Sequence, residues 1–376
     1  MKLSSQKLFW AFAFMLVLAF RVFLCAQAPI ESSDLFRNLG YTSHLGVLGL
    51  SLYDTAATRF RPEFWTQFWP TQGFLYPPAT LLFFSFFSSL GLGLFWVKLT
   101  LTLLDLLMSL IVAESLGALG GFLLFSAPVS LWYTSHEGQF DGLLALGIIA
   151  TIFALKKSHW LWAGIFWMIA LNCKQFGILL APFMLAEFLR APKESRLQIS
   201  KRFGLGLFLG FLPFVPFYLH SPDLWLKPFA TQGFIYNPFY WNLADKARFS
   251  WNPPLLVGWN AFWTWLSAAV ALIFILRRPS LIETLQGFPL LSFWALLKKL
   301  NWAQFWYTMA VPAFAFCLHR YRRIVILLLL IHWLQCGRSL ILLTRENFGL
   351  QEYPQTISHF QDCLWTCDYQ AANANL

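Results

Sequence analysis

Residues 8–28 read LFWAFAFMLVLAFRVFLCAQA. A helix rises about 1.5 Å per residue, so about 20 mostly apolar residues are needed to cross a hydrocarbon layer of about 30 Å. This run meets that length, and it follows Lys2 and Lys7. It ends in Ala26-Gln27-Ala28, which resembles a signal-peptidase site, but the run is long for the apolar core of a signal peptide. We therefore expect an uncleaved first membrane span.

The composition of the 376-residue chain extends this expectation to the whole sequence. Hydrophobic residues make up 58% of it and charged residues 12%, about half of the roughly 25% that is typical of soluble domains. The 41 Phe and 19 Trp suit a chain that faces lipid and places aromatic rings at the membrane interfaces. The net charge of +10 falls in short clusters between apolar runs, so we expect no nucleic-acid partner. The chain is predicted to be an all-α, polytopic transmembrane helical bundle.

About eleven segments are predicted to cross the membrane. They are expected at about 8–28, 98–114, 118–134, 140–155, 159–172, 176–189, 203–219, 256–276, 281–297, 302–318 and 324–342. Residues 78–92 are also apolar, but the segment is short and begins at Pro77-Pro78. This segment is expected to lie at the membrane surface with both ends outside.

Basic clusters determine the predicted orientation, because cytoplasmic loops concentrate Lys and Arg. With the N-terminus inside, the first span delivers a long loop, residues 29–77, to the extracytoplasmic side. The same assignment places four later clusters in the cytoplasm: Lys156-Lys157, Arg190 to Arg202, Arg277-Arg278 and Arg320 to Arg323. Counting residues 78–92 as a crossing would move all four clusters outside, so that alternative is rejected.

Three parts are expected along the chain. Residues 1–190 hold the outer loop 29–77 and the short loop His136–Asp141, residues 191–344 hold the other spans with a second outer loop at 220–255, and residues 345–376 form a short polar tail. The six Cys lack the spacing of zinc sites, so no structural metal is expected. In the tail, Cys363 and Cys367 either pair in an oxidising compartment or stay free thiols.

Ionisable residues that the positive-inside rule does not explain gather on the predicted outer face, and these are the candidates for chemistry. Asp34 lies soon after the first span. A carboxylate there suits a general base that deprotonates a hydroxyl; alternatively, it is a solvated acid of the loop or the N-cap of a helix. The run His136-Glu137-Gly138-Gln139-Phe140-Asp141 holds three ionisable groups and an amide. It suits binding of sugar hydroxyls, binding of a divalent cation, or capping of the helix that begins near Gly142.

Several lysines lie at outer ends of predicted spans, where the positive-inside rule disfavours them. Lys174, followed by Gln175, interrupts an apolar stretch, and Lys298 and Lys299 lie at the outer end of a later span. An ammonium group at this depth can pair with a phosphate. Alternatively, it extends to the headgroups of ordinary lipids.

Five short motifs, taken in order, resemble one class of membrane enzymes. They are Asp34-Leu35-Phe36-Arg37-Asn38, Tyr76-Pro77-Pro78, Lys98 opening a segment with Asp105, Pro128 followed by His136–Asp141, and Lys174-Gln175 followed by Pro182. Their order and spacing are similar to those of the C-type glycosyltransferases (GT-C), which use polyprenyl-phosphate sugars. The closest similarity is to the dolichyl-phosphate-glucose glucosyltransferases of asparagine-linked glycosylation. The Gly-Gln-Phe-Asp form of residues 138–141 is closer to bacterial mannosyltransferase-like relatives.

This resemblance covers about residues 8–190 and implies a function. It implies inverting transfer of glucose or mannose from a polyprenyl-phosphate donor to a lipid-linked or other glycan acceptor at the outer face, with Asp34 as the general base. It implies no metal, although a divalent cation stays open. The residues expected to bind donor or acceptor, the outer lysines included, are Arg37, Tyr76, Lys98, Asp105, His136, Gln139, Asp141, Lys174, Gln175, Lys298 and Lys299.

Two other functions stay open on the sequence alone. A transporter or lipid flippase also needs many spans, but such proteins are commonly built from two related halves with polar residues near the membrane midplane. Here the polar clusters gather at one face. A non-catalytic membrane subunit is the other alternative. We expect a multi-pass protein of the bacterial inner (plasma) membrane or the endoplasmic reticulum membrane, in contact with membrane lipids.

Overall fold

The computed structural model describes residues 5–29, 33–53, 74, 76–128, 130–225, 273 and 365. Regular structure within these ranges is helical, without a strand. The all-α prediction is therefore confirmed for the described part of the chain. The predicted spans from residue 256 onward lie outside the described residues, except for the single position Ile273.

Three of the described helices are long and apolar enough to cross a membrane, or four if one bent pair counts as a single span. The three are α1 (Ser5–Cys25), α5 (Leu94–Leu116) and the stretch Lys193–His220, which begins with α10 (Lys193–Phe211). The bent pair joins the π-helix η3 (Ser130–His136) to α7 (Asp141–Lys156) at 113°. Long apolar helices are what a membrane protein requires. The count of about eleven spans and the GT-C fold stay predictions.

Shorter helices complete the described part. They are α2 (Ser33–Ser43), α3 (Leu45–Leu48), η1 (Gly49–Tyr53), α4 (Pro78–Ser89), α6 (Ala118–Phe125), α8 (Trp160–Cys173), η4 (Gln175–Leu180), α9 (Ala181–Arg190), η5 (Leu212–Phe214), α11 (Val215–His220) and η6 (Pro222–Trp225). Helix α4 has 12 residues, which is too few to cross a bilayer. That length agrees with the surface position predicted for residues 78–92.

Two segments that were predicted as single spans are each divided in the structure. Residues 118–134 form α6, which ends at Phe125, and then η3, which begins at Ser130. Pro128 lies between them and cannot continue a helix, because it has no N–H group and its ring clashes with the preceding turn. Residues 176–189 form η4 and α9, with a proline in the first turn of α9.

The described residues belong to two compact units. Unit 1 comprises the described residues up to Leu143, Pro216–Pro222 and Trp365, and unit 2 comprises Leu144–Val215 with the described residues from Asp223 onward up to Ile273. The predicted division at residue 190 stays a prediction.

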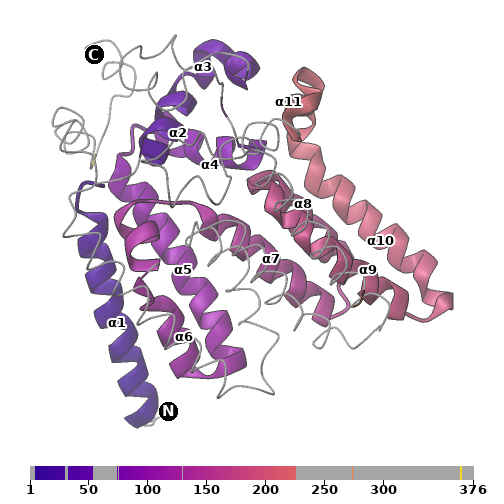
Figure 1. The fold of residues 1–376 in the computed structure, drawn as a ribbon, viewed down its shortest axis with the longest axis horizontal. Coiled ribbons are helices and arrows are strands. Elements are labelled where there is room, and N and C mark those ends of the chain that lie inside the picture. Colours follow the sequence, from indigo (N-terminus) through magenta and orange to yellow (C-terminus); the bar gives the residue numbers. More distant parts are fainter. Residues whose placement is uncertain are drawn as a thin grey trace, which may run out of the picture. The chain divides into compact units, whose positions relative to one another are not determined.

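In unit 1, helix α1 contacts α5, α6 and η3 (Figure 1). The chain turns from α5 into α6 at Gly117, and α6 then packs closely along α5. A Cβ atom at Gly121 would lie 2.4 Å from the carbonyl oxygen of Ser109, so only glycine permits this approach. Helix α2 packs on α4, where Ser88 Oγ donates to Thr42 Oγ1 at 3.1 Å.

In unit 2, α8 packs against α10 through glycines. Gly206 and Gly210 are four residues apart on one face of α10, and both are buried. A Cβ atom at Gly206 would lie 2.1 Å from the carbonyl oxygen of Leu161, and one at Gly164 would lie 2.5 Å from that of Phe203. Small residues at this spacing let helix backbones approach closely in a membrane.

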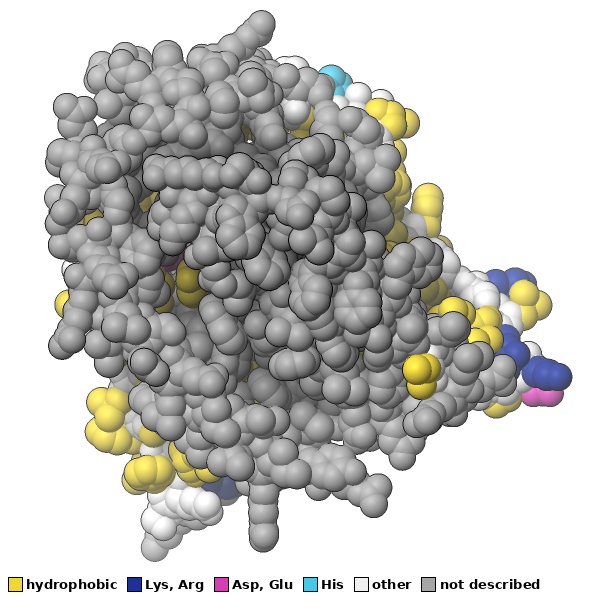
Figure 2. Space-filling model, in the orientation of Figure 1, with side chains coloured by type: hydrophobic (Ala, Val, Ile, Leu, Met, Phe, Trp, Pro, Cys, Tyr) yellow, Lys and Arg dark blue, Asp and Glu magenta, His cyan; other side chains and the backbone are white. Residues whose placement is uncertain are grey.

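The described surface is apolar along the helices and basic at one turn of unit 2. Large hydrophobic side chains are exposed along α1, among them Leu8 and Phe9, as suits contact with lipid. Figure 2 shows Lys and Arg side chains gathered at the α9–α10 turn and along the first half of α10, where Lys193, Lys201 and Arg202 are exposed. This turn belongs to a cluster that is predicted to face the cytoplasm.

Candidate functional site

A buried ion pair joins α1, α5 and η3. Arg21 and Asp105 are 0% and 3% exposed, and Arg21 Nη1 lies 3.0 Å from Asp105 Oδ2. The guanidinium also donates to the Phe125 carbonyl oxygen, from Nε at 2.9 Å and from Nη2 at 2.7 Å. Two hydroxyl oxygens accept its remaining bonds, Ser135 Oγ at 3.2 Å and Ser130 Oγ. A charge buried at this depth is costly unless it is paired and hydrogen-bonded. This network meets that requirement and holds both ends of η3.

Lys98 makes a second link between the same three elements. Its ammonium group donates to the carbonyl oxygen of Gln27, just after α1, at 2.5 Å, and to that of His136, the last residue of η3, at 3.1 Å. The side chain is fully buried. Asp105 follows Lys98 by seven positions in α5, so the ion pair lies about 10 Å further along the helix axis. Lys98 therefore lies at the level where α1 ends.

The turn between η3 and α7 carries a histidine and a carboxylate in contact. His136 Nδ1 and Glu137 Oε1 are 2.6 Å apart, and both side chains are buried. The indole ring of Trp132 stacks on the imidazole, with the ring centroids 4.3 Å apart and an angle of 4° between the planes. The imidazole is thus held at one edge and on one face. A fixed histidine of this kind can bind a hydroxyl group or exchange a proton with it.

Gly138 lets α2 pack directly on this turn. Its φ of +72° lies in the region that favours glycine. A Cβ atom there would lie 2.5 Å from Leu35 Cδ2 and 3.1 Å from Lys98 Cγ. Asp34 precedes Leu35 in the first turn of α2, where the structure describes its backbone and not its side chain. The helix that holds the predicted base therefore lies on the Lys98 and His136 cluster.

Aromatic rings pack beside the cluster. The ring of Tyr76 meets that of Phe140 edge-on, with centroids 4.7 Å apart, and it also contacts the ring of Phe74 at 5.9 Å. Phe74 continues the contact to Tyr53 at 5.8 Å. Burial, and then the nearby Tyr218, raise the pKa of Tyr53 well above its ordinary value, so this phenol stays protonated. Tyr76, predicted to bind substrate, is buried within this packed aromatic group.

Five predicted binding residues with described side chains belong to unit 1 together with Tyr76. Lys98, His136 and Asp105 belong to the linked network, and Asp141 is buried at the start of α7. Gln139 is half-buried in the same turn, and its backbone N–H donates to the carbonyl oxygen of Tyr133 at 2.7 Å. Asp105 forms its ion pair with Arg21.

The other predicted residues are not shown at this site. Lys174 is buried at the end of α8, in unit 2. The backbones of Arg37 in α2 and Gln175 in η4 are described, but their side chains are not. Lys298 and Lys299 lie outside the described residues.

Arg21 was missed by the sequence reasoning. It is the one charged residue between Lys7 and Glu31, and a charge inside an apolar span is a signal of function or of a partner within the membrane. Its partners Ser130 and Ser135 are five positions apart. They reach the same guanidinium because η3 is a π-helix, in which five residues make about one turn.

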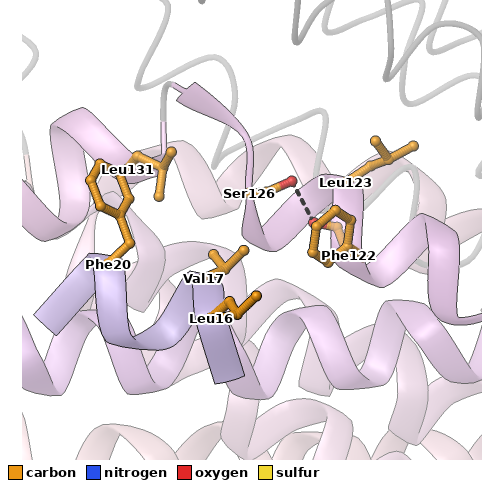
Figure 3. Close-up of a pocket in the computed structure, with 7 residues that line it drawn as sticks. All are labelled: Leu16, Val17, Phe20, Phe122, Leu123, Ser126 and Leu131. Atoms are coloured by element: carbon orange, nitrogen blue, oxygen red, sulfur yellow. Dashed lines mark hydrogen bonds between the residues drawn. The ribbon is translucent and has the colours of Figure 1, made fainter. Parts of the chain in front are cut away.

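An open apolar groove of about 490 Å³ lies between α1 and α6 (Figure 3). It is lined by Leu16, Val17, Phe20, Phe122, Leu123, Ser126 and Leu131. The one polar side chain there, Ser126, donates to the Phe122 carbonyl oxygen at 2.8 Å. The groove therefore suits hydrocarbon and offers no group for proton transfer.

Comparison of the chain with models of known protein families gives no match, and neither does comparison with curated proteins. Within the described ranges, no group of three or more His, Cys, Asp or Glu side chains is arranged to hold a metal ion. What the geometry does offer is an oriented histidine and a buried lysine beneath the helix that carries Asp34. Proton transfer and the binding of hydroxyl groups are the chemistry that these residues can perform.

Proposed function

We propose that this protein is a membrane glycosyltransferase. It moves a hexose, glucose or mannose, from a polyprenyl-phosphate donor to a lipid-linked or other glycan acceptor on the extracytoplasmic side. The observation that carries this proposal is the packing of Leu35 against Gly138. That contact brings the helix of Asp34 onto Lys98 and His136, residues that are far apart in the sequence and belong to three of the motifs that resemble the GT-C enzymes.

The depth of the cluster supports use of a lipid-linked donor. Lys98 contacts Gln27 just beyond the end of α1, and α1 is a candidate membrane span. The ends of membrane spans lie near the headgroup region, which is where the phosphate of a polyprenyl phosphate resides. An acceptor at the same level would meet the sugar without either molecule leaving the membrane surface.

In the proposed reaction an acceptor hydroxyl attacks the anomeric carbon of the donor sugar. Asp34 takes the hydroxyl proton as the new C–O bond forms. The bond from the anomeric carbon to the phosphate oxygen breaks, and polyprenyl phosphate leaves with the bonding electrons. A single displacement of this kind inverts the anomeric configuration.

The other residues have supporting roles in this proposal. The imidazole of His136, held by Glu137 and Trp132, orients a sugar hydroxyl. Because the ammonium group of Lys98 already donates to two carbonyl oxygens, its role is to hold the turn. On the sequence alone, we propose Lys174, Lys298 and Lys299 as the residues that neutralise the departing phosphate.

A transporter or lipid flippase is the second candidate, and one observation favours it. The Arg21–Asp105 pair lies within candidate membrane spans, and charged residues there often mark a transport pathway. Arg21, however, is fully hydrogen-bonded and shielded, which suits a fixed structural link better than a group that binds cargo.

A transfer assay separates the two functions. The purified protein in lipid nanodiscs would be given polyprenyl-phosphate-linked radiolabelled glucose or mannose and a simple glycoside acceptor. We expect the wild type to transfer sugar and the Asp34→Asn variant to lose activity by about 10²-fold or more, since a general base contributes about that much. Glu194→Gln, which removes an exposed acid from α10, is the matched control and should keep the wild-type rate.

Two results would count against the proposal. Transfer by Asp34→Asn at the wild-type rate would exclude Asp34 as the base. Absence of transfer by the wild type, together with movement of a labelled lipid-linked sugar across the bilayer of proteoliposomes, would favour the flippase.

A further inference from the structure

The side chain of Asn38, in α2, is buried without a partner. It is 1% exposed, and neither Nδ2 nor Oδ1 has a hydrogen-bond partner among the described residues. Most buried polar side-chain groups in native proteins are hydrogen-bonded, and an unpaired amide destabilises the folded state. An amide in this position therefore needs an explanation other than stability.

Asn38 lies next to the proposed site. It follows Leu35 by three positions, so both lie on the buried face of α2 within about one helical turn, or about 5 Å along the axis. Leu35 is the residue that contacts Gly138, between Lys98 and the His136 turn. Asp34 lies one turn before Asn38 in the same helix.

We propose that Asn38 binds the acceptor sugar through two adjacent hydroxyl groups. A primary carboxamide presents one acceptor oxygen and two N–H donors in a plane. A vicinal diol of a pyranose complements it, because one hydroxyl donates to Oδ1 while its neighbour accepts from Nδ2. The bound sugar supplies the hydrogen bonds that the fold withholds. This inference rests on the proposed function, in which Asp34 deprotonates another hydroxyl of the same sugar.

If Asn38 is unpaired until the sugar binds, removal of its amide should stabilise the free protein. If the amide held the fold together, its removal would destabilise the protein. Asn38→Leu keeps the branching and the number of heavy atoms of the side chain and removes both unpaired groups, so the midpoint of thermal unfolding of the free protein should rise by a few degrees. In the transfer assay the same variant should lose about 100-fold in kcat/KM for the acceptor, because a site built to hydrogen-bond a hydroxyl discriminates strongly when that bond is lost. The KM for the donor should not change.

Ser109 provides a matched control. Its Oγ is likewise buried without a partner among the described residues, but it lies deep in α5, where its carbonyl group faces Gly121. Ser109→Ala should also raise the unfolding midpoint, and it should leave transfer unchanged.

The acceptor probes are butyl α-D-glucopyranoside, butyl α-D-mannopyranoside and their monodeoxy analogues, used with the full chain in nanodiscs. We expect at least one monodeoxy acceptor to lose about as much activity with the wild type as Asn38→Leu loses with the parent glycoside. Asn38→Leu should transfer sugar to that monodeoxy acceptor at the same rate as to the parent glycoside. Asn38→Ala serves as a second variant, and its transfer rate should likewise be the same with the monodeoxy acceptor and with the parent glycoside.

The following outcomes would overturn the inference. Asn38→Leu that is more stable and fully active would make the amide a functionless buried group, and a destabilised variant would mean that the amide holds the fold. A raised KM for the donor alone would assign the residue to the other sugar. If the wild type transfers nothing, the proposed function fails, and binding decides: a butyl glycoside that raises the unfolding midpoint of the wild type but not of Asn38→Leu upholds the inference, and equal shifts overturn it.

Discussion

At the scale of single residues, the position of η3 depends on Arg21. Its guanidinium donates to Asp105 in α5 and to Ser130 and Ser135 in η3. Two further N–H groups meet the carbonyl oxygen of Phe125, at the end of α6. Removing one partner of a buried ion pair leaves the other charge uncompensated, which costs far more than the pair contributes when it is complete.

Arg21→Met should therefore lower the free energy of unfolding by about 3–5 kcal/mol. Arg21→Lys should not restore it, because an ammonium group lacks the planar fork that reaches the carbonyl and carboxylate oxygens together. Unfolding in a denaturing detergent, followed by circular dichroism, measures both variants.

Two controls accompany this series. Lys7→Met, which removes an exposed charge from the same helix, should change stability little. Pairing Arg21→Met with Asp105→Leu replaces the ion pair by apolar groups, so the double variant should be more stable than Arg21→Met alone. Wild-type stability of Arg21→Met would refute the role assigned to the pair.

The residue scale also shows how far the sequence could predict the site. Charge and motif order selected Lys98, His136 and Asp105, and the structure joins all three in one network. The ion pair of Asp105 with Arg21 was not predicted, because the apolar run at residues 8–28 is long enough to indicate a lipid-facing span even though it contains Arg21. Burial of Tyr76 and Asn38 could not be predicted either, since it depends on contacts between segments distant in the sequence.

At the scale of helices, the length of an apolar segment predicted the helix better than did the continuity of the apolar sequence. The short α4 and the long α5 agree with the lengths of their apolar segments. Hydropathy over residues 118–134 did not predict the division into the apolar α6 and the more polar π-helix η3. Pro128 is the sequence signal for this break, and the π-helical spacing brings Ser130 and Ser135 to one guanidinium.

The contact between α8 and α10 yields a prediction at this scale. A methyl group at Gly206 would lie 2.1 Å from the carbonyl oxygen of Leu161, so the two helix backbones must separate to admit it. Gly206→Ala should lower the free energy of unfolding by about 1–3 kcal/mol.

Gly204 is the matched control on the same helix, because a Cβ atom there meets nothing within 4 Å. Gly204→Ala should leave stability unchanged or raise it by up to about 1 kcal/mol, since alanine favours a helix. Thermal unfolding of the two variants side by side tests the packing. Equal effects would show that the glycines do not mediate the α8–α10 contact.

At the scale of the whole molecule, the claim that matters most is that the candidate site faces the extracytoplasmic side. Trp365 bears on this claim from the far end of the sequence. Its carbonyl oxygen accepts a hydrogen bond from the Gly93 N–H at 2.9 Å, and its ring lies 4.4 Å from that of Phe95. It therefore lies beside the start of α5, which is the predicted outer end of that helix. A chain that begins in the cytoplasm and crosses the membrane an odd number of times, such as the eleven predicted, ends on the extracytoplasmic side, which agrees with this position of Trp365.

Cysteine accessibility measures which side of the membrane the candidate site faces. In a protein whose six native cysteines are replaced, single substitutions would be made at Ser33 and Gln139, beside the site, and at Ser158, which is exposed in the turn between α7 and α8. A membrane-impermeant maleimide is then added to intact cells or sealed vesicles of known orientation. Ser33→Cys and Gln139→Cys should both react from the extracytoplasmic side, and Ser158→Cys only after the membrane is permeabilised. Reaction of Ser33→Cys and Gln139→Cys from opposite sides would show that these residues do not share one extracytoplasmic site.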